Sequence, residues 1–392
     1  MREATRVTAG RGLRAFADGF AALLLPLHLT ELGFDAFEVG AISTIALTGA
    51  AATSLGVGFT THLASIRKLL LGAALAMAAT GIAFGLAEGF WTVALVAFVG
   101  TLNVAGGDSS PFVPLEHATL AADAGDKGRT MAFARYGFVG IFAGAVGALA
   151  IGLIDLFKIA AESLFYLYAA IGLAIFMLYR GTPDRPPPPN AARVPLGKSK
   201  RHVLTLAALF ALDSFGSGLI VQSILALWLL VRFDFSAAET GGVFFVTRLL
   251  AAFSQFAAVW LAKHIGLVRT MVFSHLPANF LLIAVPFSGD ATIAVGLLVV
   301  RSLLTQMDIP VRQSYVMATV EPAERPAAAS LTTGPKTLAT AVGPVLAGAM
   351  LAASPFGWPF VVAGGLKIVY DLTLLALFAN RPPPEEKTDQ TG

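Results

Sequence analysis

Long apolar segments follow one another along almost the whole chain, and only short polar stretches separate them. Each segment is close to the roughly 20 residues that a helix needs to cross the hydrocarbon core of a bilayer. Charged residues make up 13% of the chain, against about 25% in a typical soluble domain. A chain with so little charge could not cover its own surface in water. The sequence therefore predicts an integral membrane protein in a lipid bilayer, not a nucleic-acid-binding or disordered one.

The apolar segments number twelve, which predicts an all-α membrane protein with twelve transmembrane helices. Two of the segments are rich in small residues, which favour close packing between helices in lipid. The expected spans lie near residues 13–33, 37–60, 69–88, 91–121, 129–154, 161–179, 203–231, 237–262, 267–287, 291–319, 327–352 and 358–379.

Lysine and arginine gather on one side of the predicted membrane. With the N-terminus inside, the inner segments hold 18 of the 27 basic residues, counting Arg129 and Arg269 at the inner ends of their spans, and the outer loops hold two, Lys158 and Arg232. Because basic loops are retained in the cytoplasm, both termini are predicted to be cytoplasmic. We expect a multi-pass protein of the inner (plasma) membrane.

One long polar connection, residues 180–202, separates six spans from six. It contains the run Pro186–Pro189, and its prolines and charges keep it extended in water. The predicted organisation is an N-terminal six-helix bundle at 1–179, a cytoplasmic linker at 180–202, a C-terminal six-helix bundle at 203–380 and a cytoplasmic tail at 381–392.

Polar landmarks recur in the same order in the two halves, at offsets of 195 to 201 residues. Parallel six-span repeats predict two pseudo-symmetric bundles related by an axis along the membrane normal, with a binding site between them. The matched positions include Phe34 and Phe235, Asp18 and Asp213, Glu116 and Arg312, and Gly147 and Gly343.

Twelve spans, a central cytoplasmic connection and a charged loop after the second span together resemble the major facilitator superfamily over the whole chain. The loop signature of that family reads roughly G-x-L-A-D-R-x-G-R-K-x-x-L. This chain keeps Gly58, Arg67, Lys68 and Leu70, with His62 at the acidic position. The resemblance implies two bundles that open a central site alternately to either side of the membrane, and it places Arg67 and Lys68 in the inner gate.

The fifth span is rich in glycine, at Gly137, Gly140, Gly144 and Gly147. Drug–proton antiporters of the same family carry a glycine-rich fifth span that ends in Gly-Pro, so this chain resembles them in part. The partial resemblance implies export of a small, cationic or amphipathic molecule in exchange for protons.

Acidic side chains within the spans need a reason to be there, because a charge at mid-bilayer costs at least about 2.5–3.5 kcal/mol. Six acidic side chains lie away from the ends of the spans, and five of them fall on spans 1, 4, 7 and 10, which line the central cavity in the family that this chain resembles. Burial favours the neutral form of a carboxyl group, so such a group can exchange protons near physiological pH. The proton-coupling candidates are Asp18, Asp108, Asp213 and Asp308; the other two acids are Glu116 and Asp371.

The tenth span carries a polar stripe, because Arg301, Thr305, Asp308, Arg312 and Tyr315 recur at helical spacing. The predicted substrate-binding residues are Arg248, Arg301, Asp108, Asp308 and Tyr315. Glu116 and Arg312 occupy matched positions near the cytoplasmic ends of spans 4 and 10, so we expect them to pair across the bundles and to close the inner gate with Arg67 and Lys68.

Simpler interpretations are local. Arg14 and Asp18 are four residues apart and can pair on one helix, as can Lys367 and Asp371. The histidines show no metal-binding spacing, and a neutral, packed imidazole is the expectation for His28 and for His275.

The chain has no cysteine and no nucleotide-binding or hydrolase motif, which predicts neither an enzyme nor a cofactor nor a metal site. The predicted function is secondary active transport by alternating access, with proton-coupled export of a small molecule by a functional monomer. One alternative is proton-coupled uptake of an organic anion bound by Arg301, Arg312 and Arg248. Another is a membrane receptor or scaffold that transports nothing.

Overall fold

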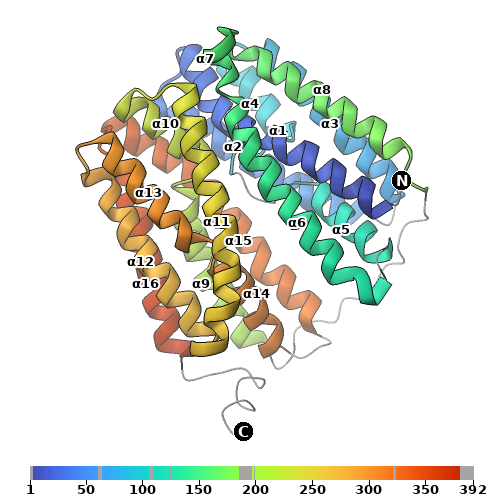
Figure 1. Cartoon of the computed structure of the whole chain (residues 1–392), viewed down its shortest axis with the longest axis vertical. Helices are drawn as coiled ribbons and strands as arrows, with labels where there is room; N and C mark the ends of the chain where they lie inside the picture. The colour runs from blue at the N-terminus through green and yellow to red at the C-terminus, as the bar shows by residue number, and fades with distance from the viewer. Residues whose placement is uncertain are drawn as a thin grey trace, which may run out of the picture. The chain divides into compact units, whose positions relative to one another are not determined.

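The computed structural model describes residues 3–60, 64–105, 110–123, 125–184, 197, 199–320 and 324–379. These residues form helices joined by turns and short irregular connections, without a β-strand among them (Figure 1). Nine of the described helical segments are long and apolar enough to cross a bilayer, and two shorter apolar helices accompany them. The prediction of an all-α membrane protein is confirmed.

The helices follow the predicted spans in chain order. Those before the central connection are α1 (Glu3–Glu31), α2 (Ala36–Thr60), α3 (Ile66–Leu86), α4 (Phe90–Val99), α5 (Phe112–Asp123), α6 (Gly125–Ala150), α7 (Leu153–Phe157) and α8 (Glu162–Arg180). Those after it are α9 (Lys200–Gly218), α10 (Gln222–Phe233), α11 (Ala237–Ile265), α12 (Leu267–Ala284), the 3-10 turn η1 (Val285–Phe287), α13 (Ala291–Thr305), α14 (Asp308–Thr319), α15 (Arg325–Ala353) and α16 (Trp358–Phe378).

Three predicted spans, 91–121, 203–231 and 291–319, are each divided into two helices: α4 and α5, α9 and α10, and α13 and α14. In the last of these, Pro310 is the third residue of α14. Proline lacks the N–H that a continuous helix would bond to the carbonyl of Gln306, so α13 ends before it and a new helix begins. Irregular backbone at membrane depth is stable only where protein rather than lipid surrounds it.

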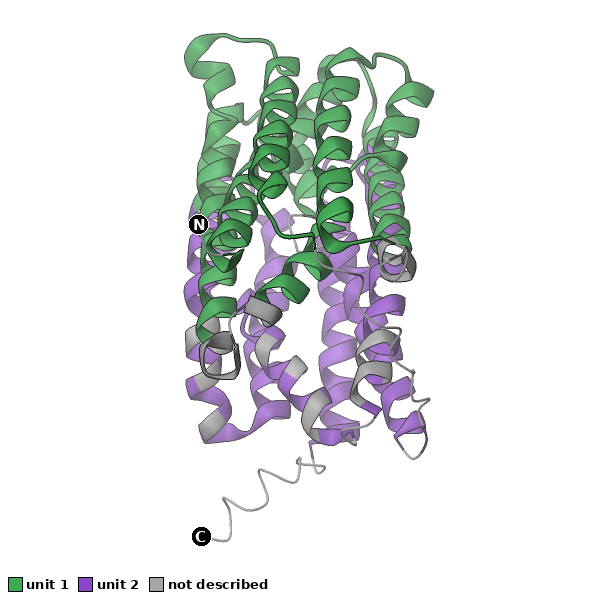
Figure 2. Cartoon of the chain, turned by 90° about the vertical axis from the view of Figure 1, so that its right-hand side faces the viewer, with its two compact units in different colours: residues 1–190, 221–245 green, residues 191–220, 246–392 purple. Residues whose placement is uncertain are grey.

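The chain forms two compact units, coloured separately in Figure 2. Unit 1 comprises residues 1–190 and 221–245, and unit 2 comprises residues 191–220 and 246–392. α10 belongs to unit 1, where the Ser223 hydroxyl lies 3.1 Å from that of Ser43 on α2. The first residues of α11 belong to unit 1 as well, and there Gly241 packs against the backbone of Ala148. The division into bundles at residues 180–202 therefore remains a prediction, since compactness groups the helices differently.

Each unit contains a helix pair whose backbones touch and whose positions match in the repeat. In unit 1, α1 packs against α6, and a Cβ atom at Gly147 would overlap the backbone of Phe16. In unit 2, α9 packs against α15, and a Cβ atom at Gly343 would overlap the backbone of Gly218. Small residues allow this approach in lipid, where packing rather than the hydrophobic effect holds helices together. The matched positions Gly147 and Gly343 thus have the same structural role.

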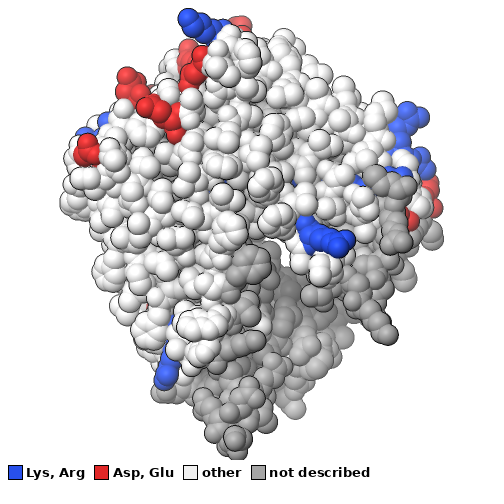
Figure 3. All heavy atoms as spheres, in the orientation of Figure 1, with Lys and Arg blue, Asp and Glu red and all other residues white. Residues whose placement is uncertain are grey.

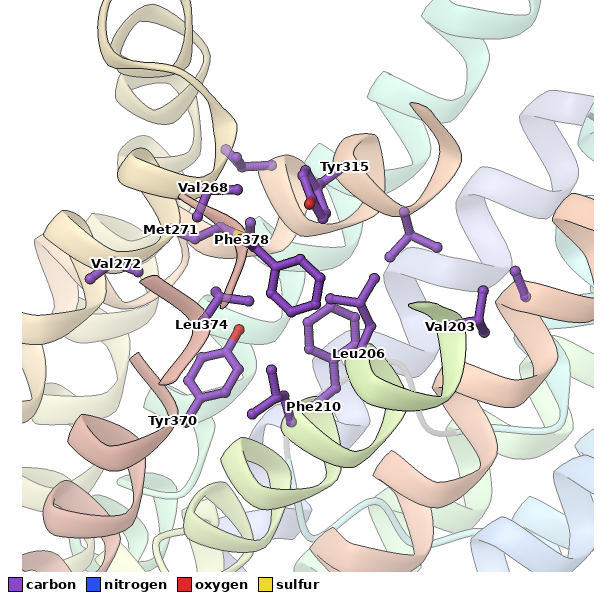
Figure 4. Packing of buried hydrophobic residues seen from close by; sticks show 14 of the residues in the cluster. Val203, Leu206, Phe210, Val268, Met271, Val272, Tyr315, Tyr370, Leu374 and Phe378 are labelled. Atoms are coloured by element: carbon purple, nitrogen blue, oxygen red, sulfur yellow. The ribbon is translucent and has the colours of Figure 1, made fainter. Parts of the chain in front are cut away.

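An apolar cluster fills unit 2 between α9, α12, α14 and α16 (Figure 4). Phe210 extends from α9, Met271 from α12, Tyr315 from α14, and Tyr370 and Phe378 from α16, and all five side chains are buried. On the outside of the molecule large apolar side chains are exposed, such as Trp91 at 82%. Most described atoms on the face in Figure 3 belong to uncharged residues, as a lipid-facing surface requires.

Candidate functional site: two buried charge clusters

A buried carboxylate on α5 joins four helices of unit 1. Glu116 is 0% exposed, and its Oε2 atom accepts a hydrogen bond from Arg14 Nη2 on α1 at 2.7 Å. Its Oε1 atom accepts one from the Tyr179 hydroxyl on α8 at 2.6 Å, and the Tyr136 hydroxyl on α6 also donates to Oε2. We call these four residues the Glu116 cluster. A cation and two hydroxyl donors satisfy a charge that would be costly to bury alone.

The local sequence of α1 makes this cluster possible. Gly10 lies against Tyr179, where a Cβ atom would overlap the phenol ring, so the hydroxyl can reach Glu116. Arg14 follows one turn later on the same face, and its guanidinium lies 5.1 Å from the centroid of the Phe112 ring. Asp18 comes one further turn along, with its Oδ2 atom 4.0 Å from Arg14 Nη1. The predicted local pair of Arg14 and Asp18 is present, at the outer limit of an ion pair.

The corresponding buried cluster of unit 2 is centred on Asp213 of α9. Its Oδ1 atom accepts a hydrogen bond from Lys367 Nζ on α16 at 2.7 Å, and its Oδ2 atom accepts one from Arg312 Nη2 on α14 at 3.0 Å. Arg312 also donates to Asp308, one turn earlier on α14, and Lys367 donates to the hydroxyl of Ser217 at 2.7 Å. We call Asp213, Asp308, Arg312 and Lys367 the Asp213 cluster.

Two aromatic rings lie next to the guanidinium of this cluster. The Arg312 guanidinium lies 4.9 Å from the ring centroid of Phe210 and 5.7 Å from that of Tyr370, two residues that Figure 4 shows within the apolar cluster. Cations bind favourably to aromatic faces, most strongly where water is excluded. The ion pairs are therefore held in a dry environment in which a change of charge has a large energetic effect.

A second acid–base pair adjoins the Asp213 cluster. His275 of α12 places its Nδ1 atom 2.9 Å from Asp371 Oδ1 on α16, and Asn279 Nδ2 donates to Asp371 Oδ2 at 2.9 Å. The opposite ring nitrogen of His275, Nε2, lies 3.8 Å from Asp213 Oδ1. One imidazole therefore lies between two carboxylates.

The predicted site residues are distributed as follows. Asp18, Asp213 and Asp308 are buried within the described helices, whereas Asp108 and the loop residue His62 lie outside the described residues. Tyr315 is fully buried in the apolar cluster. Arg248 on α11 and Arg301 on α13 are part-buried; at the start of α3, Arg67 is part-buried and Lys68 is exposed. The roles assigned to these residues remain predictions.

The structure gives two predicted pairs different partners. Lys367 bonds Asp213 and not its helical neighbour Asp371, because the two side chains leave α16 toward different helices, α9 and α12. Glu116 is paired with Arg14 in unit 1, and Arg312 with Asp213 and Asp308 in unit 2. Both charges of the expected gate pair are thus compensated within their own units.

Sequence reasoning missed the hydroxyl donors Tyr136 and Tyr179 and the bridging role of His275. These three residues have no distinguishing signal in the sequence, because a tyrosine or a histidine within a span is not unusual, whereas a charge inside a span requires a partner. Among the described residues, no group of three His, Asp or Glu side chains is arranged to hold a metal ion.

Known proteins resemble this chain along most of its length. An uncharacterized membrane protein of Saccharomyces cerevisiae is 23% identical over 411 residues, which cover 93% of this chain and 92% of the yeast protein. The crystal structure of the nucleoside transporter NupG matches with a TM-score of 0.76 at 14% identity, covering 97% of this chain and 100% of that one.

A bacterial homologue of the human lysosomal transporter Spinster, in an inward-facing occupied conformation, matches with a TM-score of 0.74 at 15% identity, covering 95% of this chain and 94% of that one. At such identities these structures show the fold alone. The sequence profile of the Major Facilitator Superfamily matches residues 7–307 and 280–392. Because these matches extend over nearly the whole chain, it belongs to the major facilitator superfamily and is a secondary membrane transporter, not an enzyme.

Proposed function

We propose that this transporter couples export of a small molecule to the entry of protons, by alternating access. The observation that carries the proposal is the bonding of Asp213, a buried carboxylate whose two oxygens bind cations on two other helices. A proton added to this group removes the charge that joins α9 to α14 and α16. Proton binding and helix packing are therefore linked in unit 2.

Coupling follows from the cost of an unpaired charge. When Asp213 is protonated, Arg312 keeps its bond to Asp308, but Lys367 keeps only the hydroxyl of Ser217. A buried ammonium that loses its anion is strongly destabilised. The helices must then rearrange, or Lys367 must find another anion or release a proton. We assign Asp213 and Asp308 as coupling residues, with Asp18 and Asp108 as further candidates. A cationic substrate would compete with the proton for these carboxylates.

The orientation is proposed from the distribution of basic residues, with both termini in the cytoplasm and the protein in the inner (plasma) membrane. Single cysteines can be introduced without background, because the chain has none. A cysteine replacing Pro188 should react with an impermeant maleimide only from the cytoplasmic side, and one replacing Asp35 only from outside. The reverse pattern contradicts the orientation.

The coupling test begins with a ligand. Purified protein is screened by thermal shift against diverse compounds at two pH values, and a hit is reconstituted in liposomes that contain a pH-sensitive dye. Adding the hit should move protons in the opposite direction through the parent protein. Asp308→Asn, which keeps the shape but removes the charge, should bind the hit and lose this proton movement.

The matched control is Asp290→Asn, which changes an exposed acid at the start of α13 and should retain proton movement. If Asp308→Asn and Asp213→Asn both concentrate the hit under a proton gradient as the parent does, the coupling proposal is wrong.

Arg301 supports a second candidate, the uptake of an organic anion. Its Nε atom is buried and has no hydrogen-bond partner among the described residues, and the ion pairs of the described helices do not include it. A part-buried guanidinium without an anion can accept a carboxylate or phosphate from a ligand. Arg301→Gln should abolish binding of an anionic hit and leave binding of a cationic hit unchanged. Asp308→Asn should leave binding of either hit measurable and change only the proton movement.

A further inference from the structure

Asp371 is a buried carboxylate whose hydrogen-bond partners carry no permanent charge. It is 0% exposed, and its two oxygens accept bonds from His275 and from the amide of Asn279. Among the described residues, His275 is also its one ion-pair partner. Burying a carboxylate without a compensating positive charge is costly. A proton on His275 turns this arrangement into a neutral ion pair.

The nearby cations are paired with other carboxylates, so the imidazole of His275 is the group that can supply a positive charge to Asp371. Arg312 and Lys367 form ion pairs with Asp213 and Asp308, and the Lys336 ammonium acts electrostatically on the same two carboxylates. The groups that contact His275 are Asp213 on α9, Tyr370 and Asp371 on α16, and Asn279 on its own helix. The other nearby charges interact with Asp213: Arg312 on α14, Lys336 on α15 and Lys367 on α16.

We propose that His275 and Asp371 form a proton-binding site on α12 and α16, and that the imidazole of His275 passes this proton to Asp213. The proton-binding site stands on its own geometry, while the transfer to Asp213 rests on the proposed proton coupling. The site lies on the ninth and twelfth spans, outside the four spans on which the sequence placed its coupling candidates.

The transfer is a balanced proton exchange. In the charged ring, the Nδ1–H donates to Asp371 and the Nε2–H faces Asp213 across 3.8 Å. The Nε2–H bond breaks and an O–H bond forms on Asp213 Oδ1, so that an imidazolium and a carboxylate become a neutral imidazole and a carboxylic acid. The two atoms must first approach by about 1 Å, or a water molecule must bridge them.

The transfer would release Lys367, which shares the same oxygen of Asp213. Lys367 and Asp371 lie one turn apart on α16, one bonded to Asp213 and the other to His275. Both ends of the proton path therefore act on the same helix. Moving one proton along it leaves both Asp371 and Lys367 without their charged partners, while the total charge stays the same.

The test measures the proton itself and needs no transported substrate. Protein labelled with ¹⁵N in histidine is titrated by NMR in nanodiscs, and the His275 signals are identified by their loss in His275→Gln. In the parent protein at pH 7, both ring nitrogens of His275 should carry protons. A neutral ring at pH 7 overturns the proposal, and this measurement does not depend on a carboxylate variant folding.

The carboxylate variants then test both ends of the path. Asp371→Asn should lower the proton affinity of His275 about tenfold or more, since an anion within hydrogen-bond distance is removed. Asp213→Asn should lower it by a smaller factor, because that carboxylate lies farther away. An unchanged affinity in Asp371→Asn overturns the site, and an unchanged affinity in Asp213→Asn overturns the transfer.

His28 is the matched control. It is a buried histidine of unit 1 whose ring packs 5.2 Å from that of Phe165, and neither ring nitrogen has a hydrogen-bond partner among the described residues. Its signals should not respond to Asp371→Asn. If His275 titrates as expected but the parent moves no protons in the liposome assay, the coupling proposal fails while the proton-binding site stands.

Discussion

The Glu116 cluster and the Asp213 cluster occupy corresponding places in the two halves of the chain, but their charges are reversed. In unit 1 the cation Arg14 lies on the first span and the anion Glu116 on the fourth. In unit 2 the anion Asp213 lies on the seventh span and the cation Arg312 on the tenth. Glu116 and Arg312 are 196 residues apart and match in the repeat. Both halves thus have a buried ion pair between these two spans, but the positions of the anion and the cation are exchanged.

The two clusters also differ in how they satisfy their carboxylates. Glu116 receives one guanidinium and two tyrosine hydroxyls, while Asp213 receives a guanidinium, an ammonium and a nearby imidazole. Hydroxyl donors solvate an anion whatever the charge of its other partners. A carboxylate held mainly by cations instead depends on every charge around it. We therefore expect unit 2 to be the half that responds to protons and unit 1 to be the more static half.

The largest effect is expected when Asp213 is lost. Asp213→Ala leaves Lys367 and Arg312 without their shared anion, and should reduce the free energy of unfolding by about 3–5 kcal/mol, measured by chemical denaturation in detergent. The double variant Asp213→Ala with Lys367→Met removes one stranded charge as well, and should recover part of the loss. A double variant no more stable than the single one would show that the ion pair is not the cause.

Removal of the cation in unit 1 should cost less. Arg14→Met leaves Glu116 with the hydroxyls of Tyr136 and Tyr179, so we expect a loss of about 2–3 kcal/mol in the same assay. Adding Glu116→Gln to this variant should restore stability, because the amide carries no charge. A larger loss in Arg14→Met than in Asp213→Ala would reverse the comparison between the two clusters.

The smallest effect concerns a single hydroxyl of the Glu116 cluster. Tyr179→Phe removes one donor from a fully buried carboxylate and should cost about 1–2 kcal/mol. The control is Tyr166→Phe on the same helix, whose hydroxyl bonds the carbonyl of Gly85 at the exposed surface and should change stability by less than about 0.5 kcal/mol. Equal losses in the two variants would mean that the hydroxyl bond to Glu116 contributes nothing.

Sequence reasoning found the acidic side chains because a charge in a bilayer is rare and costly. It identified Asp18, Glu116, Asp213 and Asp308, and all four lie buried in the structure. Its choice of partners was less successful. Spacing along one helix suggested that Lys367 pairs with Asp371, and the repeat suggested that Glu116 pairs with Arg312. Neither spacing nor the repeat shows how each helix is rotated about its axis relative to its neighbours. Partners are decided by that rotation.

The sequence by itself determined the membrane class, the twelve apolar spans and their family, because a bilayer imposes one helix length and one apolar composition on every span. Only the tertiary structure decided that Asp213 meets Lys367, 154 residues away, that Tyr179 reaches Glu116 past Gly10, and that His275 lies between two carboxylates. These contacts depend on which face each helix turns toward its neighbours. In lipid that choice is made by the close packing of small residues and by buried hydrogen bonds, and both join residues that are far apart in the chain.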